Sequence, residues 1–192
     1  MCIRDRFTDH CDKALLDRCE QGDFAEDLWR QIMANGFHQL GDAASGTTPA
    51  DIFAFLKVCG RFAVPLPMAE LLLGHSWGVA QLAPCEGLVS IGRQHGKQAI
   101  QVPWGRRAQR VFGVDENSQV VCVADAPVCV QEGSNMAAEA RDTIELGPDT
   151  QQITLSDDPF AQMALARTNL MAGTLQSTLD LGLQFAAAVS YT

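Results

Sequence analysis

The stretch from Asp157 to Thr192 reads DDPFAQMALARTNLMAGTLQSTLDLGLQFAAAVSYT and decides how the rest of the chain is interpreted. Two acidic residues followed by Pro159 are typical of a helix start, because carboxylates favour the positive end of the helix dipole and proline fits the first turn. Apolar residues then recur at helical spacing with no stop signal. They are Phe160, Met163, Ala164, Leu170, Met171, Leu175, Leu179, Leu183 and Ala187.

A helix of about 30 residues spans roughly 45 Å, and such a helix needs partners along its apolar side. No later segment supplies them, so we expect the sequence to be cut inside a helical bundle. Both ends of the chain resemble translated sequencing adapter: residues 1–6 read MCIRDR and residues 189–192 read VSYT. We expect these two segments to be non-native and exclude them from the fold prediction.

Upstream of Pro84 the pattern is helical. Aspartate or threonine precedes each of the first three apolar runs, and Asn35-Gly36 is a strong C-terminal signal. The fourth run is apolar nearly all round, which predicts a buried helix. The expected limits are Asp9 or Asp12 to Gly22, Asp23 to Asn35-Gly36, Thr48-Pro49 to Gly60 and Pro65, and Pro67-Met68 to about Leu82, with a loop at 37–48.

From Gly87 onward, short runs rich in Val and Ile alternate with Gly, Pro, Asp and Asn. Runs about ten residues apart without helices between them predict an antiparallel barrel or sandwich. Residues 94–97 and 115–118 are predicted hairpin turns. The six expected strands cover residues 88–91, 99–102, 110–114, 120–123, 127–130 and 152–155.

The predicted fold class is therefore α+β and multidomain. An all-α domain covers residues 7–84, a small antiparallel β-barrel or sandwich covers 85–156, and the first helix of a truncated C-terminal bundle covers 157–192.

Composition narrows the function. A net charge of -9 gives no electrostatic basis for nucleic-acid binding. The one dense basic cluster, Arg106, Arg107 and Arg110, is expected to be a solvated turn, with an anion contact as the alternative. The most apolar window, 62–82, contains Pro, Glu and His and is too broken for a membrane span.

The seven cysteines are odd in number and form no Cys-x-x-Cys pair, so neither zinc ligation nor a disulfide framework is predicted. Free, mostly buried thiols indicate a cytoplasmic protein, and Cys122 and Cys129 are expected to face a core from strands. The four histidines are far apart in sequence, and no metal site is expected. We expect His75 to be a satisfied core or boundary residue and His95 to be solvated in a turn.

Several motifs occur in one order. Leu28-Trp29 lies on an amphipathic helix that ends at Gly36-Phe37, and a later helix ends with Val58-Cys59-Gly60-Arg61 before Pro65-Leu66-Pro67. Gly87–Ser90 opens the β region, Val102–Gly105 lies within it, and Met171–Asp180 lies on the long helix. Together these motifs resemble the acyl-CoA dehydrogenase family, in a divergent member. An unrelated helical plus β protein is the alternative.

The resemblance implies a flavoprotein that binds FAD between the middle domain and the C-terminal bundle. Such enzymes remove hydrogens from the α and β carbons of an acyl-CoA thioester, with the flavin as hydride acceptor, in fatty acid metabolism and usually as oligomers. The catalytic carboxylate is expected beyond Thr192, so no catalytic residue is assigned. The fragment itself is expected to be inactive.

The resemblance also places the flavin contacts. Ser90 carries the one hydroxyl on the first strand that could serve, and Val102, Pro103 and Trp104 stand where the family has Trp-Ile-Thr-Asn. The family's Thr-Glu-Pro and Gly-Ser-Asp motifs are absent, and proline has no N–H to donate. Two functions follow: an acyl-CoA dehydrogenase with a divergent flavin strand, or a non-catalytic partner subunit of a heteromeric dehydrogenase that has lost its flavin motif. Outside the family, a plain helical interaction module is the third option.

Overall fold

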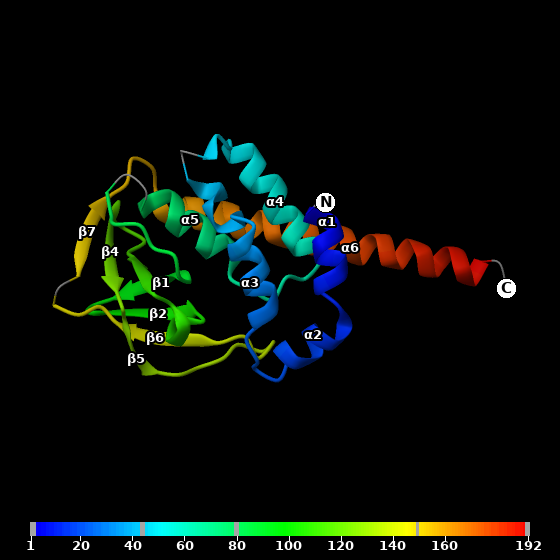
Figure 1. Cartoon of the computed structure of the whole chain (residues 1–192), viewed down its shortest axis with the longest axis horizontal. Helices are drawn as coiled ribbons and strands as arrows, with labels where there is room; N and C mark the ends of the chain where they lie inside the picture. Colours follow the sequence, from blue (N-terminus) through cyan, green and yellow to red (C-terminus); the bar gives the residue numbers. More distant parts are fainter. Residues whose placement is uncertain (1–2, 43–44, 79–80, 149, 191–192) are drawn as a thin grey trace.

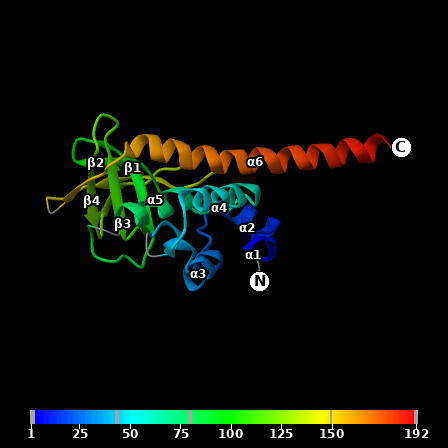
Figure 2. The same cartoon turned by 90° about the horizontal axis from the view of Figure 1, so that it is seen from above.

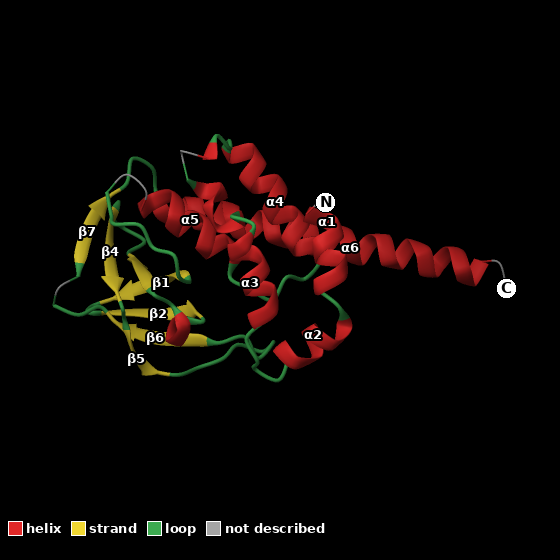
Figure 3. Ribbon diagram, viewed as in Figure 1, coloured by secondary structure: helices red, strands yellow, loops and turns green. Residues whose placement is uncertain are grey.

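The computed structural model describes residues 3–42, 45–78, 81–148 and 150–190. Helices gather at one side of a curled sheet (Figure 1, Figure 3). In the described residues the α-helices are α1 (Ile3–His10), α2 (Lys13–Cys19), α3 (Glu26–Ala34), α4 (Pro49–Arg61), α5 (Met68–Gly78) and α6 (Pro159–Ser190), with 3-10 turns η1 (Phe37–Gly41) and η3 (Gly105–Arg107). The strands are β1 (Val89–His95), β2 (Gln98–Pro103), β3 (Arg110–Val114), β4 (Val120–Asp125), β5 (Val128–Gln131), β6 (Arg141–Glu145) and β7 (Gln151–Thr154).

Two of the predicted helix starts are confirmed by their caps. The Asp12 carboxylate accepts a hydrogen bond from the Leu15 N–H at 2.8 Å, at the start of α2. Thr48 and Asp51 form a reciprocal capping box at the start of α4, with Pro49 in the first turn. Such caps satisfy N–H groups that have no partner within the helix.

The predicted cap at Asp23 is wrong. The Asp23 N–H donates to the Arg18 carbonyl at 3.2 Å, so this residue belongs to the turn that closes α2. The next helix, α3, starts three residues later, and its N-cap Ala25 makes no side-chain bond. Glu26 and Asp27 in the first turn supply the negative charge that the dipole favours. Asn35 ends α3 as expected, with Gly36 at φ 69°.

The ends of two other predicted segments also differ. The expected loop at 37–48 contains η1, and α4 continues through Gly60 to Arg61. The fourth helix, α5, is described as far as Gly78, and residues 79 and 80 lie outside the described chain, so its predicted end near Leu82 stays a prediction. The Leu82 N–H donates to the Gly78 carbonyl at 2.9 Å. Most of α5 is buried, as its continuous apolar sequence predicts.

The sheet has seven strands in the order β5-β6-β2-β1-β3-β4-β7. All six predicted strands are present, and both predicted hairpin turns join antiparallel neighbours, β1 with β2 and β3 with β4. The expectation of a purely antiparallel sheet is wrong, because β1 pairs in parallel with β3. Because β2 lies on one side of β1 and β3 on the other, the chain between β2 and β3 crosses past β1 to form the parallel pair.

Strand β6 was not predicted from the sequence. It reads RDTIE and contains one large apolar residue, Ile144, so it lacks the Val- and Ile-rich signal of the other strands. Its side chains do alternate in burial, but one of the two buried positions is the carboxylate Asp142. A charge at a core position hides the alternation on which strand prediction depends.

The two faces of the sheet bury different clusters, as period-2 alternation requires. On β3, Phe112 faces the cluster shared with the helices, whereas Val111 faces the inside of the curl. On β4, Cys122 faces the inside of the curl, and Cys129 of β5 packs against the same cluster, as expected. The larger cluster is continuous from α1 to α6 through the sheet.

Helix α6 crosses α4 at two glycines. A Cβ atom on Gly60 would lie 1.9 Å from the Leu170 carbonyl oxygen, and one on Gly173 would lie 2.0 Å from the Lys57 carbonyl oxygen. Each helix therefore needs a glycine where the other helix's backbone passes. Figure 2 shows the two helices side by side, with α6 extending well beyond α4.

Polar contacts fix the first half of α6 to the helices beneath it. The Trp77 indole N–H donates to Gln162 at 2.6 Å, and Arg167 donates to the buried Glu70 at 2.7 Å. The Asp158 carboxylate caps α6 by accepting from the Phe160 N–H at 2.8 Å. The predicted apolar stripe is buried at Met163 and half-buried at Leu170, but large apolar residues from Met171 to Phe185 are exposed. The domain boundaries at 84/85 and 156/157 remain a prediction.

Candidate functional site

The four residues predicted to contact a flavin lie close together and are all buried. The Ser90 hydroxyl donates to the Pro103 carbonyl at 2.6 Å, so its hydrogen is used within the sheet. Val102 faces the inside of the curled sheet. Of the four, Trp104 lines a cavity. Their contact with a flavin stays a prediction.

Trp104 lies in a strained turn. Its φ is 51°, a left-handed conformation that costs a non-glycine residue about 1–3 kcal/mol. The Trp104 backbone N–H donates to the Ala140 carbonyl at 3.1 Å, and the Trp104 carbonyl accepts from the Arg107 backbone N–H at 2.9 Å. The next residue, Gly105, has no room for a side chain, because a Cβ there would lie 2.8 Å from Ile144.

A buried ion pair holds this turn. Asp142 is fully buried and accepts hydrogen bonds from the Arg106 backbone N–H at 2.8 Å and from the Arg106 guanidinium at 2.6–3.1 Å. The Gly133 N–H adds a bond at 3.3 Å. Burial raises the pKa of Asp142, but the bonds from Arg106 and Gly133 outweigh it and hold that pKa below its usual value. Sequence reasoning missed this pair because Asp142 and Arg106 are 36 residues apart.

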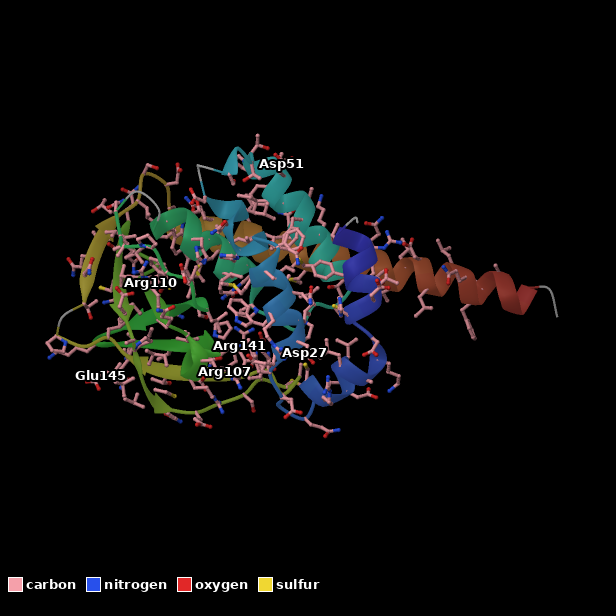
Figure 4. The ribbon with its side chains drawn as sticks, viewed as in Figure 1. Asp27, Asp51, Arg107, Arg110, Arg141 and Glu145 are labelled. Atoms are coloured by element: carbon pink, nitrogen blue, oxygen red, sulfur yellow. The ribbon has the colours of Figure 1, made fainter. Side chains whose placement is uncertain are left out.

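The predicted solvated turn is confirmed for Arg106 and Arg107, which are exposed in η3, and it is wrong for Arg110, which is buried. All three arginines have acidic partners. Besides Arg106, Arg107 donates to Glu26 at 2.8 Å and its guanidinium lies 4.6 Å from the centre of the Phe24 ring. Arg110 is buried and donates to Asp125 at 2.5 Å. Figure 4 shows Arg107 at the end of the sheet that faces α3, with Arg110 deeper among the strands. Arg110 is buried although the sequence predicts a solvated residue, because it pairs with Asp125, which is 15 residues away in the sequence.

A cavity of about 360 Å³, called here the junction cavity, opens where α2, the end of α4, the linker before α5, the Trp104 turn and α6 meet. Its polar side chains are Glu20, Glu139 and Thr174, and the Thr174 hydroxyl already donates to a backbone carbonyl at 3.1 Å. The remaining wall is mostly apolar, formed by Leu16, Cys19, Cys59, Gly60, Ala63, Val64, Pro65, Leu66, Trp104, Ala137 and Leu170.

Two features of this wall matter for binding. Burial raises the pKa of the Cys19 and Cys59 thiols, so both are protonated and act as small apolar groups at neutral pH. The Trp104 indole Nε1 is buried and has no hydrogen-bond partner in the described part of the chain. The Trp104 ring meets the Phe24 ring edge to face, with ring centres 5.0 Å apart, and its indole N–H stays an unpaired buried donor beside the cavity.

A second cavity, called here the histidine cavity, has a volume of about 190 Å³ and lies between η1, α5, the linker after α5 and strands β1 and β3. His38 and His75 line it, with ring centres 5.4 Å apart. The expectation that His75 is satisfied is wrong, because its buried Nε2 has no partner among the described residues. His95 is exposed in its turn, as expected.

Neither cavity contains an obvious metal cluster. In residues 3–42, 45–78, 81–148 and 150–190, no three or more His, Cys, Asp or Glu side chains are placed to hold an ion. Within those same ranges, no helix combines the length and hydropathy needed to cross a bilayer. The described cysteines are free thiols: Cys11, Cys19, Cys59, Cys85, Cys122 and Cys129.

No protein-family model matches the sequence, and no curated protein matches it. Solved structures do match the fold. A variant of the steroid acyl-CoA dehydrogenase Tcur3481-Tcur3483 superposes with a TM-score of 0.59 at 18% identity, over 88% of this chain and 59% of that one. The chain has an acyl-CoA dehydrogenase-like fold.

A second structure with the acyl-CoA dehydrogenase-like fold matches over a similar extent. It is a nitrososynthase from Micromonospora carbonacea var. africana, with a TM-score of 0.59 at 14% identity, over 91% of this chain and 62% of that one. The chain therefore spans about three fifths of the length of either relative. At these identities the comparison concerns the fold, and the predicted family resemblance is confirmed at that level.

Proposed function

We propose that this chain is the N-terminal and middle part of an acyl-CoA dehydrogenase-like flavoprotein that acts in the α,β-dehydrogenation of an acyl-CoA thioester. The observation that carries the proposal is the junction cavity, which lies between the helices, the Trp104 turn and α6. A mostly apolar pocket with few polar groups is typical of small-molecule sites. It suits the acyl portion of the substrate.

Within this proposal each wall has a role. Leu16, Leu66 and Leu170 contact the acyl chain and exclude water, and the protonated Cys19 and Cys59 thiols extend the apolar surface. The Trp104 ring forms part of the wall, and the Arg106–Asp142 pair holds its turn in position. The family's catalytic base has no counterpart among these residues.

The flavin contacts do not fit a cofactor held by this chain alone. Ser90 donates its hydroxyl hydrogen to Pro103, Val102 has an apolar side chain that faces the sheet core, and Pro103 has no N–H. Trp104 retains an unpaired donor. FAD supplies hydride acceptance in enzymes of this class, and we assign no step on this chain to it.

The hydrogen bond from Ser90 to Pro103 favours a second candidate, a non-catalytic partner subunit in a heteromeric dehydrogenase. A subunit that binds no flavin needs no free donor on β1, and the Ser90–Pro103 bond then serves the sheet alone. In both candidates the protein is part of an oligomer that binds acyl-CoA in the cytoplasm.

Isothermal titration calorimetry of the chain with acyl-CoA tests the shared part of the proposal. We expect Ala137→Phe to abolish binding, because Ala137 is exposed on a loop and a larger side chain there fills the junction cavity. Ala164→Phe, on the exposed side of α6, is the matched control and should bind normally. Equal binding by both variants would show that the acyl group binds elsewhere.

Visible absorbance separates the two candidates. The protein extended through its bundle and purified alone should show the two flavin bands if it holds FAD, and it should then oxidise acyl-CoA. A colourless protein that becomes yellow only with a partner subunit would establish the second candidate.

A further inference from the structure

The histidine cavity brings together two imidazoles that are 37 positions apart in the sequence. His38 belongs to η1 and His75 to α5, and their ring planes meet at 67°. His38 is 7% exposed. His38 Nδ1 and His75 Nε2 are both buried and have no hydrogen-bond partner in the described residues. Two unpaired nitrogens on neighbouring rings that line one cavity are unusual, because buried polar atoms nearly always have partners.

The second nitrogen of His38 is already used. A hydrogen bond to the backbone of Ile32 raises the pKa of His38, while the larger effect of burial lowers it. Since Nδ1 has no partner, that bond is made by Nε2, which leaves the lone pair of the neutral ring on Nδ1. Histidines that bind metals typically donate their other N–H to a backbone carbonyl in this way.

The spacing of the rings suits one shared ion. Two imidazoles on a tetrahedral metal, with metal–nitrogen distances of about 2.0–2.1 Å, have ring centres about 5 Å apart. The observed separation is 5.4 Å. A cavity of about 190 Å³ also has room for water molecules around an ion.

Burial is the main cause that lowers the pKa of both rings, and charged groups around them act in both directions. Burial, then His38 and Arg110, lower the pKa of His75 to about 4. Asp42 and Glu86 line the same cavity and act on His75 and His38 in the opposite direction. The positive charge of Arg110 is compensated by Asp125, to which it donates at 2.5 Å. Cys85, also on the wall, is a protonated thiol because burial raises its pKa.

We propose that the histidine cavity binds a divalent transition-metal ion of the zinc, nickel and copper class, through His38 Nδ1 and His75 Nε2, with water in the remaining positions. Imidazole nitrogen suits these metals. With two protein ligands the site is exchangeable rather than permanently filled. It lies apart from the junction cavity and does not depend on the proposed function.

Long-range ¹H–¹⁵N spectra of the four histidine rings, titrated with Zn²⁺, test this site in the unaltered chain. We expect the resonances of His38 Nδ1 and His75 Nε2 to shift together at one equivalent. Those of His10 and His95, which are exposed, should not move. Shifts confined to His10 or His95, or to one of the two cavity rings, would overturn the proposal.

Calorimetry with Zn²⁺ on variants gives an independent measurement. His38→Gln and His75→Gln should each weaken binding at least tenfold, while His95→Gln, the matched control, binds like the parent. Cys85→Ser should also bind like the parent, because the thiol is not a proposed ligand. Binding that persists in both histidine variants, or that is lost in the Cys85 variant, would refute the two-imidazole site.

Discussion

At the residue scale, a buried pair supports the turn that carries Trp104. Asp142 is fully buried, and Arg106 reaches it with its backbone N–H and its side chain. Loss of the Asp142 charge leaves Arg106 paired with Glu132 and partly exposed, but it weakens the charge-assisted hydrogen bonds that hold the turn.

We therefore expect Asp142→Asn to lower the free energy of unfolding by about 1.5–3 kcal/mol. Asp27→Asn is the matched control, because it removes the exposed Asp27–Arg30 pair, and such pairs contribute at most about 1 kcal/mol. Urea denaturation followed by circular dichroism gives both values. Similar losses in the two variants would mean that the Asp142 pair contributes no more than a surface contact.

The histidines predict a pH dependence. Because the pKa of His75 is lowered in the folded chain to about 4, and that of His38 is lowered too, the unfolded chain binds protons that the folded chain excludes. Stability is therefore highest above about pH 6.5, the ordinary histidine value, and falls as the pH drops toward 4.

The free energy of unfolding measured at pH 7 and pH 5 should show this fall in the parent chain, and His75→Gln should reduce it. His95→Gln, altered in an exposed turn, should leave the difference unchanged. A pH dependence identical in all three chains would exclude His75 as a cause.

The caps show what the sequence could predict at this scale. Asp12 and Thr48 were predicted because capping depends on neighbours three residues away. The Arg106–Asp142 pair was not predicted, because its two residues are 36 positions apart. The contact between His38 and His75 was not predicted either, because these residues are 37 positions apart. Trp104 was identified through the family resemblance. Its strained φ and its unpaired indole N–H are visible only in the folded structure.

At the element scale, the crossing of α4 and α6 depends on Gly60 and Gly173. A Cβ atom on either residue would lie about 2 Å from a carbonyl oxygen of the other helix, closer than any real contact. The same long helix carries Gly182, where a Cβ would meet nothing within 4 Å. Two glycines in one helix therefore have opposite expected effects.

Gly173→Ala should destabilise the chain by about 1–3 kcal/mol or more, because overpacking forces the helices apart. Gly182→Ala should instead strengthen α6 by about 0.5–1 kcal/mol, since alanine is the better helix former. Circular dichroism during chemical denaturation measures both. Equal effects would mean that α6 does not cross α4 at this residue.

Element prediction succeeded where the pattern is local and failed where tertiary contacts decide. β3 was predicted with its limits unchanged, from a continuous apolar run. β6 was missed because its buried Asp142 breaks the alternation. The parallel pairing of β1 with β3 could not be foreseen, since the run lengths do not say which strands become neighbours.

At the scale of the whole molecule, the last part of α6 leaves large apolar side chains exposed. Leu175, Leu179 and Leu183 are each more than 60% exposed. Exposed apolar rows of this kind promote association. We expect the chain to form dimers or larger species in solution.

Sedimentation velocity should show this association, and the double variant Leu175→Glu, Leu179→Glu should shift the chain toward monomer. Gln176→Glu adds a charge to the same turn without removing apolar surface and is the control. A monomeric parent chain would contradict the prediction.

The order of the strands has a kinetic consequence. Three of the six pairings join strands that are not consecutive: β1 with β3, β2 with β6, and β4 with β7. Pairings of this kind must close long loops before they gain stability, and chains rich in them fold slowly. The sheet therefore cannot form hairpin by hairpin as the chain leaves the ribosome. The outer edges of β2 and β4 stay unpaired until β6 and β7 have been made, and until then the partial sheet needs protection from aggregation.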